Sequence, residues 1–153
     1  TQVGSSAASD VYKRQVGAEV SLAPPAPLGS AEVDALNDDI VELLTGNPIS
    51  FISGSAEFVW GSDGVLDEIA QLLVDVPGIS VVVRGHTDSD GVPESNLQLS
   101  TDRAAMVAAA LVDGGLERSS VSWEGVGSAE PVIIGGVEDK VMSRRVEIFV
   151  LAA

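Results

Sequence analysis

Apolar residues recur with two different periodicities along this chain, and the changes of periodicity predict where helices end and strands begin. Over residues 31–46 an apolar residue recurs every three or four positions, which is the spacing of an amphipathic helix. The recurring residues are Val33, Leu36, Ile40, Leu43 and Leu44. Ser30 is expected to cap this helix, and Gly46 and Pro48 are expected to end it. Its other face is acidic and is expected to be solvated.

Two further helices are predicted by the same spacing. The first begins after a capping Ser62 and ends before Pro77-Gly78. Its apolar face carries Leu66, Ile69, Ala70 and Leu73. The second runs from about Glu94 to Asp113, where the glycine pair at 114–115 ends it.

Four apolar or alternating runs predict strands. The run Ile49–Ile52 follows a proline, and Ile79–Val83 is almost entirely β-branched, which is typical of a strand buried on both faces. The two alternating runs contain Val121 and Trp123, and Val146, Ile148 and Val150. Helices alternate with the first three strands, and none separates the last two. We therefore predict an α/β (α+β) fold whose mixed sheet is covered by helices.

Three segments follow from this pattern. Residues 1–30 are expected to be a disordered tail that ends in a Pro-rich linker, SLAPPAPLGS, at 21–30. Within the tail, Ser5–Gln15 resembles translated adapter sequence, and we interpret it as non-native. Residues 31–46 form the acidic helix. Residues 47–153 form one domain, which is large enough to bury a sizeable core.

Charge and composition narrow the classes of function. The 153 residues carry a formal net charge of −15, and the charges within 1–30 cancel, so the excess lies in the helix and the domain. Such a surface repels nucleic acid and anionic lipid, which are bound mainly through Lys and Arg. The absence of cysteine excludes disulfides, thiolate metal sites and cysteine nucleophiles. No run approaches the roughly 20 apolar residues of a membrane span. We expect any membrane attachment to come through an anchor or N-terminal region that is missing here.

The segment GHTDSDG at residues 85–91 carries the densest polar chemistry. It follows the buried strand directly, and open α/β sheets place their ligands at the carboxyl ends of strands. On the next helix, Asn96, Leu99 and Arg103 are spaced so that they share one face. The Arg103 side chain leans toward the helix N-terminus and therefore toward Asp88. We predict a small pocket flanked by an acid and a base.

Several motifs, taken in order, resemble one family. They are Ile79–Val83 with GHTDSDG, Asn96, LS at 99–100, RA at 103–104, Val107, the Gly125-Val126-Gly127 to Pro131 stretch, and Arg144-Arg145-Val146-Glu147. Over roughly Ile49 to Val150 the chain resembles the C-terminal domain of OmpA, Pal and MotB proteins. The resemblance implies a β-α-β-α-β-β sandwich, here with an extra N-terminal helix. It also implies an exported cell-envelope protein that is tethered to peptidoglycan and uses no cofactor and no catalysis.

The resemblance further implies the ligand, which is the diaminopimelate of the peptidoglycan stem peptide. Asp88 matches the family aspartate that binds the ammonium group of this ligand, and Arg103 matches the arginine that binds its carboxylate. The chemistry suits these roles, because a carboxylate accepts hydrogen bonds from an ammonium and a guanidinium matches a carboxylate in a planar fork.

Other residues are assigned by the same resemblance. Thr87, Ser89 and Asn96 match positions that line the family's pocket. Gly54 falls in the loop where the family places another ligand contact. The family usually has Asn before the arginine pair, where this chain has Ser143. Arg144 and Arg145 are therefore interpreted as support for the fold and the site.

Alternatives stay open at this point. Asp88 and Arg103 could pair with each other as a structural ion pair. His86 is the only histidine and lacks the further ligands of a zinc site, so we predict no metal. The domain could instead be a protein–protein interaction module that uses the apolar loop 132–137 and the acidic helix 31–46. An enzyme is a distant third alternative, because no GxSxG or Walker motif is present.

Overall fold

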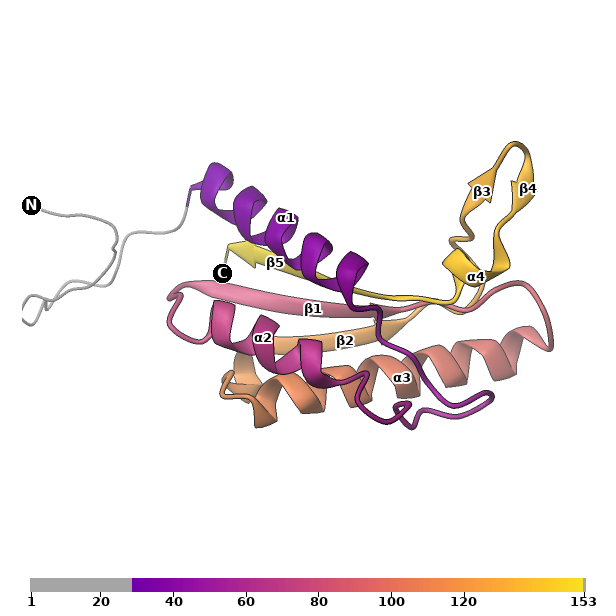
Figure 1. The fold of residues 1–153 in the computed structure, drawn as a ribbon, viewed down its shortest axis with the longest axis horizontal. Helices are drawn as coiled ribbons and strands as arrows, with labels where there is room; N and C mark the ends of the chain where they lie inside the picture. The colour runs from indigo at the N-terminus through magenta and orange to yellow at the C-terminus, as the bar shows by residue number, and fades with distance from the viewer. Residues whose placement is uncertain (1–28, 153) are drawn as a thin grey trace, which may run out of the picture.

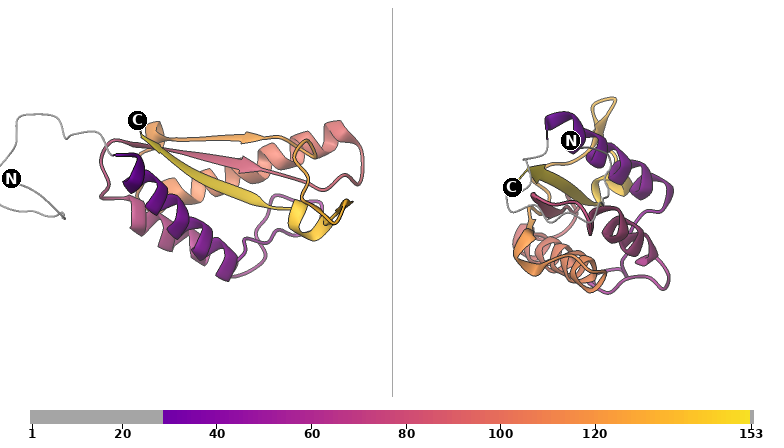
Figure 2. Two further views of the ribbon diagram at one scale, coloured as in Figure 1. Left: turned by 90° about the horizontal axis from the view of Figure 1, so that it is seen from above. Right: turned by 90° about the vertical axis from the view of Figure 1, so that its left-hand side faces the viewer.

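The computed structural model describes residues 29–152 and arranges them in two layers, a three-stranded sheet with helices on one face (Figures 1 and 2). The helices are α1 (Ser30–Gly46), α2 (Gly64–Leu73), α3 (Pro93–Asp113), the 3-10 turn η1 (Arg118–Ser120) and α4 (Lys140–Ser143). The strands are β1 (Ile79–Gly85), β2 (Val121–Gly125), β3 (Ile133–Ile134), β4 (Val137–Glu138) and β5 (Val146–Ala152). The predicted tail and linker, apart from the last two of their 30 residues, lie outside the described residues.

The sheet has the order β2-β1-β5, with β1 parallel to β2 and antiparallel to β5. The predicted mixed sheet is therefore confirmed. Register places Val81 beside Val121 on one side and Val150 on the other, so an apolar row crosses all three strands. All three side chains are buried. Burying an aliphatic side chain of this size stabilises the fold by about 1.5–3 kcal/mol.

The three long helices complete the core. The largest fully buried apolar side chains on the helices are Ile40, Leu66, Ile69, Leu73, Val107 and Leu111. The apolar face predicted for α2 is confirmed, although the N-cap is Asp63 and not the expected Ser62. Ser62 instead donates its hydroxyl to the Ser50 carbonyl, 2.8 Å away. Within the described part of the chain, no helix combines the length and the apolar character needed to cross a membrane.

Two glycines let α3 lie unusually close to one end of the sheet. A Cβ atom on Gly85 would lie 2.2 Å from the Ser100 carbonyl oxygen, and one on Gly125 would lie 2.2 Å from the Thr101 nitrogen. The hydroxyl of Ser100 donates to the Leu97 carbonyl and accepts from the backbone N–H of Gly127. This close contact fixes the first half of α3 over the carboxyl ends of β1 and β2.

The acidic helix α1 packs along β5 and joins the core through Ile40. Its N-cap is Gly29 and not the expected Ser30, and the Gly29 N–H donates to the Glu32 carboxylate. The Asn37 amide bonds the backbone of β5, donating to the Val150 carbonyl at 3.0 Å and accepting from the Val150 N–H at 2.8 Å. One side chain thus satisfies the outer edge of β5 at this residue.

The strand predicted at Ile49–Ile52 is wrong. Phe51 forms only an isolated antiparallel bridge with Phe58, and the two rings stack with centroids 5.1 Å apart. The chain folds back on itself here, because the Ile52 N–H donates to the Glu57 carbonyl and the Val59 N–H donates to the Ser50 carbonyl. Its backbone partners lie within its own loop, so the first strand of the expected β-α-β-α-β-β order is not formed.

A small arm, residues 132–143, replaces the loop expected after Pro131. It consists of the β3–β4 hairpin and the single turn α4, and the hairpin extends away from the main body in Figure 1. Gly135 and Gly136 form the hairpin turn with φ angles of 61° and 81°. Turns of this left-handed kind favour glycine and match the twist of two-residue hairpins.

Candidate ligand-binding pocket

A pocket of about 810 Å³ opens at the carboxyl end of β1. Four segments build its walls: the loop 48–54, the residues that follow β1, the first half of α3, and the junction of α4 with β5. Of the residues predicted for the site, those that line it are Gly54, Thr87, Asp88, Asn96, Arg103, Arg144 and Arg145. Ser89 was also predicted to line it and is not among the lining residues.

Asp88 presents its carboxylate to the pocket from a sheltered position, with its side chain 10% exposed. Its Oδ1 accepts the backbone N–H of Asp90 at 3.0 Å, and its Oδ2 accepts a hydrogen bond from Arg144 Nη1. Burial by itself would raise the pKa of Asp88. The hydrogen bonds from Arg144 and Asp90 and the charges of Arg144 and Lys140 outweigh burial and hold this pKa below its ordinary value. The carboxylate is therefore ionised at neutral pH.

Arg103 reaches the pocket from α3 and is held by the loop on the opposite wall. Its Nε donates to the Ser55 carbonyl at 2.8 Å, and its Nη2 donates to the Ile52 carbonyl at 3.4 Å. The guanidinium also lies 4.9 Å from the centre of the Phe51 ring. Burial and the nearby charge of Arg144 lower the pKa of Arg103. Arginine nevertheless stays charged in proteins, so the pocket keeps a cation on this wall.

Asp88 and Arg103 do not pair with each other. Asp88 forms its ion pair with Arg144, while Arg103 bonds backbone carbonyls and has no carboxylate partner within residues 29–152. The structural ion pair considered as an alternative is therefore absent from the described structure. The pocket holds an acid and a base that are both lining residues and are not neutralised by one another.

Thr87 and Asn96 fix the backbone of the Asp88 loop. The Thr87 N–H donates to the Gly127 carbonyl at 2.9 Å, and its hydroxyl donates to the Asp88 carbonyl at 3.0 Å. The Asn96 amide donates to the Asp90 carbonyl at 2.7 Å. Gly54 lies in the loop on the other wall, with φ at 70° and open space where a Cβ would be.

The arm and Arg144, the residue that follows it, are tied to the Asp88 loop by three polar links. Ser89 donates its backbone N–H and its hydroxyl to the two oxygens of Glu138. Lys140 donates to Asp90 Oδ1 at 2.7 Å, and the third link joins Arg144 to Asp88. Ser89 therefore positions the arm beside the pocket, and its side chain faces Glu138.

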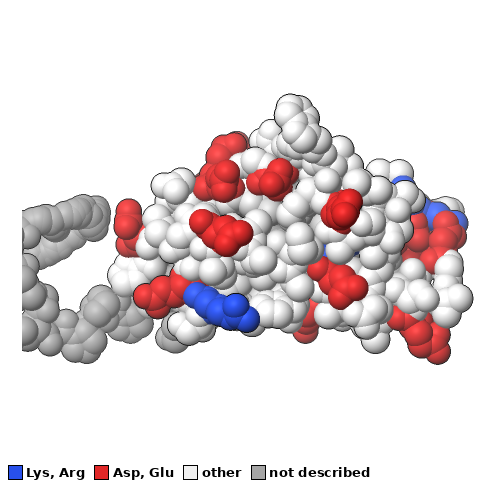
Figure 3. Space-filling model, turned by 90° about the horizontal axis from the view of Figure 1, so that it is seen from below, with Lys and Arg blue, Asp and Glu red and all other residues white. Residues whose placement is uncertain are grey.

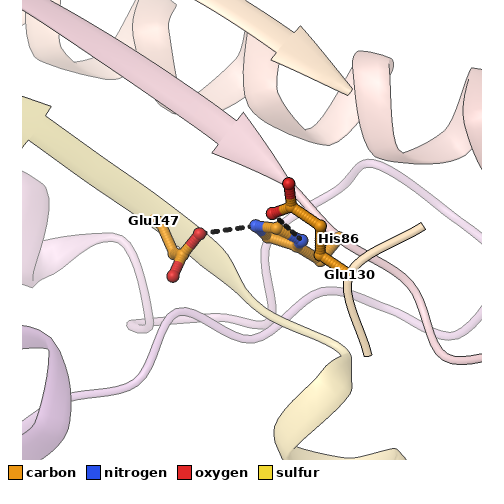
Figure 4. Close-up of side chains that lie close together, drawn as sticks. All are labelled: His86, Glu130 and Glu147. Atoms are coloured by element: carbon orange, nitrogen blue, oxygen red, sulfur yellow. Dashed lines mark hydrogen bonds and ion pairs between the residues drawn. The ribbon is translucent and has the colours of Figure 1, made fainter. Parts of the chain in front are cut away.

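A second polar cluster, which sequence reasoning missed, consists of the lining residue His86 with Glu130 and Glu147 (Figure 4). The His86 ring is fully buried, and its Nε2 lies 2.6 Å from Glu147 Oε1. Its Nδ1 has no hydrogen-bond partner and lies 4.0 Å from Glu130 Oε1. The hydrogen bond with His86 lowers the pKa of Glu147 against the opposing effect of burial, and the charge of Arg145 acts in the same direction.

The same cluster has the residue types of a metal site, and its ligand atoms lie within 4.8 Å of one another. The two nitrogens of one imidazole point in different directions, however, and Glu147 already occupies one of them. Arg84 lies 3.9 Å from Glu130 and Arg145 lies 3.6 Å from Glu147. These cations balance the carboxylates, so the arrangement fits a charge network that supports the end of β1 better than an ion site.

Positive charge gathers at the pocket. Of the six Lys and Arg residues in the described part of the chain, three line the pocket and Lys140 pairs with Asp90 on its rim. Figure 3 shows one face on which acidic side chains are scattered and basic ones are few. In a chain of net charge −15, this placement gives the pocket a local positive charge that the rest of the described surface lacks.

Comparison with known proteins identifies the family. Residues 50–145 match the OmpA family, so the chain belongs to it. Peptidoglycan-binding protein ArfA of Mycobacterium tuberculosis is 33% identical over 129 residues, which cover 84% of this chain and 39% of ArfA. The chain thus spans about two fifths of the length of this relative.

Solved structures share the fold. The periplasmic domain of Helicobacter pylori MotB superposes with a TM-score of 0.60 at 23% identity, covering 69% of each chain. The peptidoglycan-associated lipoprotein from Burkholderia pseudomallei gives 0.56 at 27% identity, covering 67% of this chain and 86% of that one. Other relatives are named as outer membrane proteins. The predicted family, fold class and cell-envelope setting are confirmed.

Proposed function

We propose that this domain binds peptidoglycan non-covalently in the cell envelope and receives the diaminopimelate of the stem peptide in its pocket. Asp88 binds the ammonium of the ligand's zwitterionic centre, and Arg103 binds its carboxylate. One observation carries this proposal: an acid and a base line one pocket without pairing with each other. Two similar proteins support the proposal by their names: ArfA is a peptidoglycan-binding protein, and the Burkholderia protein is a peptidoglycan-associated lipoprotein.

The other predicted residues have supporting roles in this proposal. Thr87 and Asn96 hold the Asp88 backbone, Gly54 leaves room on the opposite wall, and Ser89 fastens the arm. Arg145 holds the pocket floor by donating to the Glu130 and Ser143 carbonyls. The domain performs no catalysis. A longer protein that contains it would be tethered to the wall through this pocket.

The expected affinity is modest for a single site. A charge-assisted hydrogen bond contributes roughly 1.5–3 kcal/mol net. Two such contacts and a few backbone bonds correspond to dissociation constants of about micromolar to millimolar. Peptidoglycan repeats its stem peptide many times, so several tethered domains would bind with avidity that no single site supplies.

Arg103→Gln tests the proposal most directly, with Arg118→Gln as the matched control. Both substitutions remove one positive charge, but Arg118 lies in η1 and does not line the pocket. We expect Arg103→Gln to lower retention on purified sacculi by more than about tenfold, as the loss of a charge-assisted contact predicts. Free meso-diaminopimelate should compete with retention of the parent. Equal retention of both variants, with unchanged circular dichroism, would exclude this site.

Incubation with peptidoglycan also separates binding from catalysis. We expect no soluble fragments to be released from sacculi during prolonged incubation with the parent protein. Release of muropeptides that stops in the Asp88→Asn variant would replace the binding proposal with an enzymatic one.

The arm favours a second candidate function, protein–protein interaction. Its apolar side chains Ile133, Ile134 and Val137 are 55%, 56% and 69% exposed. Substituting these three residues with Ser leaves the pocket lining intact. If the domain acts through the arm, this triple variant would change the elution volume in size-exclusion chromatography while retention on sacculi stays at the parental level. Loss of sacculus binding in the triple variant would instead make the arm part of the wall-binding surface.

A further inference from the structure

The contacts of Asp88 point to a role for Arg144 that its position in the sequence does not reveal. One carboxylate oxygen of Asp88 is taken by the backbone N–H of Asp90, at 3.0 Å, within the same loop. The other oxygen accepts a hydrogen bond from Arg144. The oxygen that the loop leaves available to a ligand is therefore already covered by a side chain of the protein itself.

Arg144 is held much more loosely than the other arginines of the pocket. Its side chain is 47% exposed, and its guanidinium has no hydrogen-bond partner other than Asp88 among residues 29–152. Arg103 bonds two backbone carbonyls and lies over Phe51. Arg145 also donates to two backbone carbonyls. Of the three lining arginines, Arg144 is the one that can leave its partner without breaking other bonds.

Burial explains why Asp88 needs a cation in the free protein. A sheltered carboxylate without a partner is costly, so some positive group must accompany it. A ligand ammonium provides the same charge and the same hydrogen-bond donors as one arm of a guanidinium. Replacing one by the other keeps Asp88 neutralised throughout. Displacement would also move Arg144 away from Arg103, whose pKa its charge lowers.

From this geometry we infer that Arg144 is an exchangeable internal cation, which closes the free pocket and must be displaced from Asp88 by the ammonium of the ligand. Arg144 thus competes with the ligand and sets the affinity of the site. The inference rests on the proposed function for the identity of the ligand. The competition itself concerns any primary ammonium that reaches Asp88.

Competition by Arg144 predicts the direction in which the ligand affinity changes when Arg144 is removed. The apparent affinity of a site is reduced by the fraction of molecules in which the site is blocked. Arg144→Gln removes the competitor, so the dissociation constant for meso-diaminopimelate should fall by on the order of fivefold, as expected for a partly exposed ion pair. Arg144→Lys retains a competing cation and should stay near the parent. Arg118→Gln loses the same charge far from the pocket and should also bind as the parent does.

The experiment is a titration of each variant of the 153-residue chain with meso-diaminopimelate. NMR follows the Asp88 side-chain carboxyl carbon and the Arg144 Nε–Hε signal. If the ligand ammonium replaces Arg144 on Asp88, the ligand should shift both signals in the parent, and Arg144→Gln should bind the ligand more tightly. Weaker or equal binding by Arg144→Gln would overturn the inference, because Arg144 would then be a ligand contact or a bystander.

A second probe separates this inference from the proposed function. Titration with n-propylammonium chloride reports access to the Asp88 carboxylate without any peptidoglycan chemistry. Tighter binding of this probe by Arg144→Gln, with no retention of any variant on sacculi, would uphold the exchange and reject the proposed ligand. Equal binding of the probe by the parent and Arg144→Gln would reject the exchange whatever the sacculi show.

Discussion

The two ends of β1 each carry a hollow, and the two hollows differ in charge. The pocket at the carboxyl end measures about 810 Å³ and is lined by three arginines and two aspartates. The hollow at the other end, lined by the turn at 73–79, Val81, the segment 115–117 and Ser120, measures about 290 Å³. Among residues 29–152, the charged side chains that line it are the acids Asp75 and Glu117.

This difference shows what distinguishes a binding site from a surface depression in an acidic protein. Acidic side chains occur at both ends, but cations are concentrated at one. The cations at the pocket end have different partners. Arg144 neutralises Asp88, whereas Arg103 donates to backbone carbonyls and keeps its charge available. A pocket with one compensated acid and one uncompensated base suits a zwitterion, and the far hollow has nothing to match it.

Gly85→Ala should have the largest effect, because it disturbs the packing of α3 at the pocket end of the sheet. A methyl group there would lie 2.2 Å from the Ser100 carbonyl oxygen, which is a backbone atom that cannot rotate away. The helix α3 would be pushed off the pocket end of the sheet, and overpacking of this kind costs about 3 kcal/mol. Urea unfolding measures the loss.

Gly46→Ala is the matched control, because nothing lies within 4 Å of the position its Cβ would take. Its free energy of unfolding should stay within about 0.5 kcal/mol of the parent or rise slightly. If Gly85→Ala were as stable as Gly46→Ala, the close approach of α3 to the sheet would be wrong.

Asp88→Asn and Asp75→Asn test whether the two hollows differ in binding, because each variant removes one carboxylate from one hollow. Asp88→Asn should weaken retention on sacculi by more than about tenfold, since an amide cannot supply the negative charge that an ammonium needs. Asp75→Asn should be retained like the parent. Equal losses in both variants would mean that overall charge, and not the pocket, governs binding.

The smallest expected effect is a pH dependence that belongs to the pocket end. The pKa of Glu147 is lower in the folded protein than its ordinary value, chiefly because of the hydrogen bond with His86. The folded state therefore binds fewer protons at Glu147 than the unfolded chain does. Its stabilising contribution is present above the ordinary Glu pKa of about 4.3 and is lost as the pH falls through the lower, folded pKa.

Urea unfolding of Glu147→Gln between neutral and acidic pH checks this expectation. The variant should be less stable than the parent near neutral pH, and the two should converge in acid. A stability difference that stays constant down to the most acidic point would show that Glu147 acts through packing and not through its charge.

Local patterns predicted much of the fold. A β-branched run identified β1, alternation identified β5, and helical spacing located α3 to within a residue. The same spacing located α2, but this helix ends at Leu73, three residues before the predicted end. The run Ile49–Ile52 misled because apolar content alone does not say where its backbone partners lie, and they lie inside its own loop. The β3–β4 hairpin had a usable signal, since Gly135-Gly136 between β-branched residues favours a two-residue turn.

The pocket was predicted in part for a similar reason. Asp88 and Arg103 lie on consecutive elements, so loop position and helical spacing brought them to one end of the sheet. The partners of these residues come from distant segments. Three hydrogen bonds depend on the antiparallel return of β5 and on the arm. They join Arg144 to Asp88, Ser89 to Glu138, and His86 to Glu147. Spacing along the chain carries no information about such contacts.

The Asn37 amide that bonds Val150 has a consequence for self-association. A strand at the border of a sheet exposes unpaired backbone groups that recruit other chains, and β5 is an apolar strand, VEIFVLA, at such a border. With α1 in place, the Val150 N–H and carbonyl are already used by Asn37. A fragment that begins after Gly46 would leave both groups unpaired, so we expect it to self-associate more readily than the chain that keeps α1.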